Sequence, residues 1–315
     1  MRRRTIVAQR TRCGMHALAP DPRAASKLWL AMTEESMASV DACRTDLLIH
    51  LRRMDGATAA AAVGLALARR IDAWVTGLHV VPIAPAAFAS PEAIALYVNE
   101  ADTLYRDALA LAPSWNERLQ SLGLGGEWQV AQGDTVESLC HASRWSDLVV
   151  VERPQLNPDA PTGWGTVSRT VFGASAPVVV VPENHAPAEV GARILVAWNQ
   201  SREAMLAIRG ALPLLAGAAH VTVLEGDPGD NPFGLRYLPR QDLRAWLARR
   251  GIHPEYRAFT AQKDRGAALL EIAHAQAADL IVMGAWGHSR ITELVLGGTT
   301  RHLFQHSDLP LLVAH

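Results

Sequence analysis

The feature that most constrains the fold of this chain is an internal repeat. The segment Asp-Leu-Val-Val-Val at 147–151 returns as Asp-Leu-Ile-Val-Met at 279–283. At the same spacing, four further identities follow without a gap: Gly165 with Gly297, Arg169 with Arg301, Phe172 with Phe304, and Ser175 with Ser307. A match of this length indicates a tandem duplication, so both copies are expected to share one fold.

Each copy alternates short apolar runs with helical patterns. The expected strands are 46–51, 75–81, 126–132, 147–152 and 177–182, then 193–198, 220–225, 255–260, 279–284 and 309–314. The expected helices are 57–70, 99–122, 135–144 and 165–174, then 201–216, 239–251, 264–277 and 298–306. Nearly continuous apolar strands are typical of parallel sheets covered by helices on both faces. The sequence therefore predicts two tandem five-stranded, doubly wound, Rossmann-like α/β domains, over residues 41–183 and 191–315.

Composition narrows the class of partner. The formal net charge is −1, with 49% hydrophobic and 19% charged residues, which is ordinary for a globular protein and gives no general attraction to nucleic acid or membranes. The three cysteines are scattered without CxxC spacing, which favours a reducing compartment. We therefore expect a cytoplasmic protein that binds neither DNA, RNA nor a membrane.

The N-terminus differs from the rest of the chain. Basic residues outnumber acidic ones over 1–36, and no apolar stretch there is long enough for a signal peptide. Residues 1–40 are expected to form a disordered basic extension, with Met37 as an alternative translation start. A basic arm that binds nucleic acid is the less favoured interpretation.

Glycines gather after the fourth strand of the second copy. Gly284 and Gly287 follow the apolar run, and Gly297 and Gly298 open the next expected helix. Ligands of open α/β sheets bind beyond the carboxyl ends of the strands, and a helix N-terminus with close backbone approach suits phosphate. The glycines thus predict a phosphate site, with tight turns and a simple helix start as the alternative.

The pattern Gly-x2-Gly-x9-Gly-[Gly/Ser/Thr] over 284–298 resembles the universal stress protein family, and the likeness extends over about 44–183 and 191–315. The resemblance implies an adenine nucleotide alpha hydrolase-like fold. In nucleotide-binding members this loop holds the phosphates of ATP, and an Asp after the first strand holds the adenosine. It implies ATP and Mg²⁺ as candidate cofactors, no catalytic residue and no protein-bound metal. The implied nucleotide site comprises Asn199, Ser201, Gly284, Gly287, His288, Ser289, Gly297, Gly298 and Thr299.

The sequence departs from the family pattern at several positions. Asn199 stands where the family has Asp, and Gly298 stands where Ser or Thr is usual. In the first copy, Glu152 and Gln155 replace the first two glycines, and a carboxylate would repel phosphate. We therefore expect a degenerate first site and a nucleotide site in the second copy.

Three functions remain open at this point. The favoured one is a stress-response sensor or regulator that binds ATP, without a dedicated chemical step but with slow hydrolysis not excluded. The alternatives are a nucleotide-free interaction protein and an adenylyl-transferring enzyme, which the lack of a recognisable catalytic motif disfavours. His302 and His306, with His288, could bind metal, although solvated surface is favoured.

Contacts between the copies are also predicted. The fifth strands, Val178–Val181 and Leu311–Val313, are expected to pair within the chain, which covers two sheet edges at once. A homodimer remains open. Trp74, Trp128 and Trp145 are expected in the core or at the contact between the domains.

Overall fold

The structure is a computed structural model that describes residues 44–82, 91–154, 165–185, 189–226, 241–261, 263–285 and 298–315. Residues 44–315 form one compact unit. The extension expected over 1–40 lies outside the described residues. No helix in the described part of the chain is long and apolar enough to cross a membrane.

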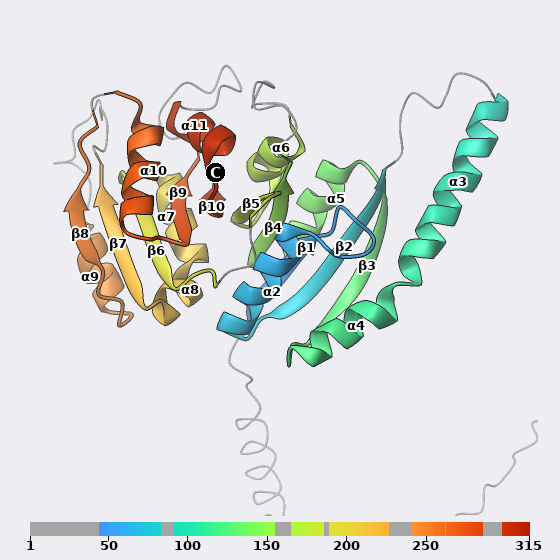
Figure 1. Cartoon of the computed structure of the whole chain (residues 1–315), viewed down its shortest axis with the longest axis horizontal. Helices are drawn as coiled ribbons and strands as arrows, with labels where there is room; N and C mark the ends of the chain where they lie inside the picture. Colours follow the sequence, from blue (N-terminus) through green and yellow to red (C-terminus); the bar gives the residue numbers. More distant parts are fainter. Residues whose placement is uncertain are drawn as a thin grey trace, which may run out of the picture. The chain divides into compact units, whose positions relative to one another are not determined.

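Strands and helices alternate through both copies, as predicted (Figure 1). The first half contains β1 (Asp46–His50), α2 (Ala59–Ile71), β2 (Trp74–Pro82), α3 (Pro91–Leu109), α4 (Ala112–Ser121), β3 (Gly126–Gly133), α5 (Thr135–Ala142), the short 3₁₀ helix η2 (Ser143–Trp145), β4 (Leu148–Arg153), α6 (Thr166–Gly173) and β5 (Val178–Pro182). The second half contains β6 (Arg193–Trp198), α7 (Arg202–Gly210), α8 (Leu212–Gly217), β7 (His220–Glu225), α9 (Leu243–Ala248), β8 (Glu255–Ala258), α10 (Arg265–Ala275), β9 (Leu280–Gly284), α11 (Gly298–His306) and β10 (Leu311–Ala314).

The two halves share one sheet. Its ten strands lie in the order β3-β2-β1-β4-β5-β10-β9-β6-β7-β8. Strands are parallel within each half, whereas β5 and β10 are antiparallel, with Leu312 opposite Val179. The predicted pairing of the fifth strands is therefore present within the chain, and it removes two open sheet edges. In each half the strand order reverses beside the first strand, where doubly wound folds bind ligands.

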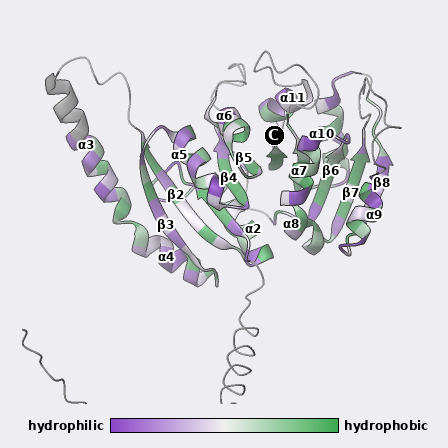
Figure 2. Cartoon of the chain, turned by 180° about the vertical axis from the view of Figure 1, so that it is seen from behind, coloured by the Kyte–Doolittle hydropathy of each residue, from purple (hydrophilic) through white to green (hydrophobic). Residues whose placement is uncertain are grey.

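Side chains of the strands fill two cores, one on each face of the sheet. In β4, Leu148 and Val150 belong to one buried cluster, while Val149 and Val151 belong to the other. This alternation follows from the two-residue period of a strand. Figure 2 shows that the central strands are largely hydrophobic, as expected for strands covered by helices on both faces.

Two expected helices are each broken into two. The segment predicted as one helix over 99–122 forms α3 and α4, and the segment over 201–216 forms α7 and α8. Pro113 and Pro213 lie in the first turn of α4 and α8. Proline lacks an N–H and its ring clashes with the carbonyl four residues earlier, so a proline is tolerated at a helix start but not inside.

The tryptophan prediction was wrong for two of the three residues. Trp145 is 79% exposed at the end of η2, and Trp74 is 37% exposed at the start of β2. Both lie at the ends of elements, where the backbone leaves the layers that bury the middle of each strand. Trp128, in contrast, packs against the core, and its Nε1 donates to the carbonyl of Ala108 at 2.8 Å.

Candidate functional site

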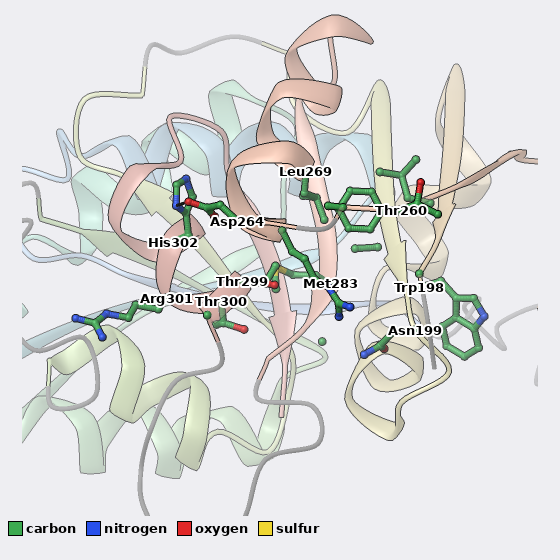
Figure 3. A pocket seen from close by; sticks show the side chains of 18 of the residues that line it. Trp198, Asn199, Thr260, Asp264, Leu269, Met283, Thr299, Thr300, Arg301 and His302 are labelled. Atoms are coloured by element: carbon green, nitrogen blue, oxygen red, sulfur yellow. Dashed lines mark ion pairs between the residues drawn. The ribbon is translucent and has the colours of Figure 1, made fainter. Parts of the chain in front are cut away.

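A cavity of about 950 Å³ lies at the carboxyl ends of the strands in the second half. Its walls come from the ends of β6, β7, β8 and β9 and from the first turns of α10 and α11 (Figure 3). Since β6 and β9 are the neighbours at which the strand order reverses, this is the position where the fold class binds ligands.

Four predicted site residues line this cavity: Asn199, Gly284, Gly298 and Thr299. Ser201 is not among its lining residues. Instead, the buried Ser201 hydroxyl caps α7 by accepting a hydrogen bond from the N–H of Ala204 at 3.1 Å. The other predicted site residues lie outside the described residues: Gly287, His288, Ser289 and Gly297.

Asn199 lies in the short connection between β6 and α7. Its Oδ1 accepts a hydrogen bond from the N–H of Ser201 at 3.2 Å, and Gln200 between them has a φ of 61°. The side-chain oxygen is thus used in an Asx turn. The amide NH₂ group of Asn199 is the part that can donate to a ligand in the cavity.

Gly284 is required by packing at the end of β9. A Cβ at this position would lie 2.4 Å from the backbone nitrogen of Ala204 and 2.8 Å from the carbonyl carbon of Glu203. The backbone of β9 therefore contacts the first turn of α7 so closely that no side chain fits between them. Close helix–strand approach accounts for this glycine whether or not a ligand binds.

We expect Gly284→Ala to lower the free energy of unfolding by about 1–3 kcal/mol, because the added methyl group meets backbone that must shift. Gly298→Ala is the matched control, since a Cβ there has no neighbour within 4 Å among the described residues. Urea unfolding of both variants measures the difference. Equal stability of the two variants would show that the contact between β9 and α7 is not tight.

The N-terminus of α11 is suited to an anion. Its first turn carries no acidic residue, and no described residue lies within 4 Å of the place that a side chain at Gly298 would take. The first N–H groups of a helix lack partners within the helix and carry the positive end of its dipole. Arg265 and Arg301 line the same cavity, in which Asp264 is the only carboxylate among the described lining residues. These groups together favour a negatively charged ligand.

Asp264 is engaged by its neighbours. One carboxylate oxygen accepts a hydrogen bond from the N–H of Ala267 at 3.1 Å, and the other lies 3.1 Å from Nδ1 of His302. Figure 3 shows Asp264 and His302 pointing toward each other. His302 also lies beside His306, with ring centroids 4.6 Å apart. In the described part of the chain, no group of three His, Cys, Asp or Glu side chains could hold a metal ion, and His288 lies outside it.

Several lining residues were not predicted. Phe259, Leu269 and Met283 form an apolar wall, and Thr260 and Arg265 lie beside it. The sequence predicts the third strand of the second copy over 255–260, which places Phe259 and Thr260 inside that strand. Because β8 ends at Ala258, both lie beyond its carboxyl end. They therefore lie where ligands of open α/β sheets bind, and the position of the strand end is the signal that identifies them.

The first half carries a different arrangement at the same register. Leu47 pairs with Leu148 as Ile194 pairs with Leu280, which places Arg52 at the position of Asn199 and Glu152 at the position of Gly284.

Glu152 is buried, and one of its oxygens lies 3.3 Å from Nη1 of Arg52. The other accepts a hydrogen bond from the N–H of Ala60, in the first turn of α2, at 3.4 Å. A side chain of the protein thus provides the anion at this helix N-terminus. The neighbouring cavity of about 610 Å³ includes Glu152 in its wall, which is unfavourable to phosphate.

Known proteins resemble this chain in two ways: a family model matches its second half, and solved structures share the fold of most of the chain. Residues 192–315 match the model of the universal stress protein family. A universal stress protein from Archaeoglobus fulgidus is 16% identical, with a TM-score of 0.64 over 85% of this chain and 95% of that chain. A functionally unknown protein from Pseudomonas aeruginosa PAO1 is 15% identical, with a TM-score of 0.54 over 86% and 92%. At these identities, both likenesses concern the fold. The comparison with curated protein sequences finds no match.

Proposed function

We propose that the second half of this chain, in which residues 192–315 match the model of the universal stress protein family, binds an adenine nucleotide, ATP in particular, and acts as a cytoplasmic stress-response sensor. The observation that carries the proposal is the start of α11. There, Gly298 and two arginines, Arg265 and Arg301, line one cavity at the switch point of the sheet.

The described residues fit the two ends of such a ligand. The first N–H groups of α11, at Gly298 and Thr299, would hold phosphate, with Arg301 nearby to balance its charge. Asn199 would donate from its amide group to the nucleoside, and the apolar wall of Phe259, Leu269 and Met283 would contact the base. Mg²⁺ would be bound together with the phosphates.

The proposed role is reversible binding rather than catalysis. Occupancy would then follow the concentration of the nucleotide, and any hydrolysis would be slow. The first half would have a structural role, because Glu152 and Arg52 already occupy the corresponding positions. One nucleotide per chain is therefore expected.

The test is isothermal titration of the full chain with ATP, ADP and AMP, each with and without Mg²⁺. We expect micromolar affinity for at least one of them and a stoichiometry near one. Two ligands per chain would contradict the structural role of the first half. The absence of both binding heat and thermal shift at millimolar nucleotide would contradict the proposal itself.

The second candidate is a nucleotide-free interaction protein of the same fold. One observation favours it: Gly284 is needed for contact with α7, so that glycine does not require a ligand. Asn199 also favours this candidate, because it carries no charge and its side-chain oxygen is engaged in a turn. A failed titration would support this candidate.

A further inference from the structure

We propose that Arg153, which belongs to the first half, is a positioning residue for the cavity of the second half. It holds the C-terminal end of α11, the helix whose first turn lines that cavity. This inference rests on the proposed function in one respect only, since nucleotide affinity is one of its two readouts.

The guanidinium of Arg153 extends from the end of β4, in the first half, to the end of α11, in the second half. Its Nη1 donates to the carbonyl of Leu303 at 3.1 Å and to that of Phe304, and its Nη2 donates to the carbonyl of Ser307. The last carbonyls of a helix carry the negative end of its dipole. A planar guanidinium with several donors is well suited to them.

Arg153 is partly buried, so its charged donors need hydrogen-bond partners within the protein. Burial lowers the pKa of the Arg153 guanidinium, while the charge of Asp308 opposes that shift. A guanidinium withdrawn from water destabilises the fold unless its donors have partners, which the three carbonyls provide. All three of these hydrogen bonds end on the last turn of α11 or on the residue that follows it.

α11 connects this contact with the cavity. The helix has nine residues, a length of roughly 13 Å at 1.5 Å per residue. Gly298 and Thr299 at its start line the second-half cavity, and Gln305 near its end lines the cavities of both halves. A shift at the held end therefore moves the N–H groups at the other end.

The two halves differ in the residue at the end of the fourth strand. The residue that matches Arg153 in the second half is Ala285, which has no side-chain donor for the end of α6. Near the end of α6, the ring of Phe172 instead stacks on that of His315, with centroids 4.4 Å apart. α11, whose end Arg153 holds, is the helix whose first turn lines the second-half cavity.

The test compares Arg153→Met, Arg153→Lys and Arg118→Met in the full chain. Arg118 is the matched control, because it also donates to a backbone carbonyl, that of Gly56 at 2.9 Å, but within the first half. The readouts are the ATP dissociation constant from titration and the hydrogen exchange of amides 298–306 without ligand.

We expect Arg153→Met to weaken ATP binding by roughly 3- to 30-fold, the usual range for coupling through a shared element. Amides of α11 should also exchange faster, while those of β6 and β7 keep their rates. Arg153→Lys should recover part of both effects, because it keeps the charge but loses the planar set of donors. Arg118→Met should leave both readouts unchanged.

Unchanged exchange in α11 would overturn the inference, and so would an ATP affinity unchanged in Arg153→Met. An equal loss of affinity in Arg118→Met would also overturn it, since the effect would then be a general loss of stability. If the unmodified chain binds no nucleotide, the proposed function fails separately. The exchange rates of α11 then still decide whether Arg153 holds the helix.

Discussion

Replacing Thr299 by glutamate is expected to stabilise the folded chain slightly and to abolish nucleotide binding. Thr299 lies in the first turn of α11, which carries no acidic residue. A carboxylate there interacts favourably with the helix dipole, typically by about 0.3–1 kcal/mol. The same charge repels a bound phosphate by roughly 4 kcal/mol at 4 Å for an effective dielectric constant near 20. We therefore expect the affinity for ATP to fall by roughly 100-fold or more.

The opposite signs of these two effects separate a binding defect from misfolding. Thermal unfolding gives the stability, and titration with ATP gives the affinity. Thr166→Glu is the matched control, because Thr166 is exposed in the first turn of α6 and belongs to the first half. It should gain the same small stability and leave ATP binding unchanged. Binding of ATP to Thr299→Glu with wild-type affinity would mean that phosphate is not held at α11.

Acidification from pH 7 to pH 4 is expected to cost the folded chain roughly 3 kcal/mol through His50 alone. Burial, followed by the charges of His79 and Arg52, lowers the pKa of His50 from 6.5 to about 4. The unfolded chain therefore takes up this proton at a higher pH than the folded chain does. The stability contributed by the neutral ring is present above about pH 6.5 and is lost progressively as the pH falls toward about 4.

Urea unfolding at pH 7 and pH 4 of the unmodified chain and of His50→Gln measures this contribution. The variant should lose less stability on acidification, by roughly 3 kcal/mol. The comparison between the two proteins is needed because other groups titrate as well. Burial raises the carboxyl pKa of Asp46 and of Asp279, which acts in the opposite direction. An identical loss in both proteins would contradict the assignment to His50.

The sequence by itself determined the fold class and the order of the strands along the chain. Continuous apolar runs such as Val178–Val181 are local features that predict buried parallel strands. Because the sequence repeats, the same prediction holds for both copies. The pairing of β5 with β10 could also be anticipated, because each half would otherwise leave its fifth strand exposed at a sheet edge. The breaks before Pro113 and Pro213 were missed, although the rule that predicts them is also local.

Part of the candidate site could also be predicted from the sequence. The glycine spacing and the family resemblance predicted Gly284, Gly298 and Thr299 as site residues. The end of the first strand of the second copy predicted Asn199, and all four line the cavity. Phe259 and Arg265 were missed, because they follow β8 and begin α10, elements distant in sequence from the glycine loop. Their place in the cavity depends on the strand order of the sheet.

Only the tertiary structure decided what several of these residues do. Gly284 contacts the start of α7, Glu152 is paired with Arg52, and Arg153 reaches the end of α11 in the other half. Each contact joins segments far apart in the chain, and none is encoded by a local pattern. Residue type and spacing specify strands, helices and turns, whereas the distances between their side chains arise only when the layers pack around one shared sheet.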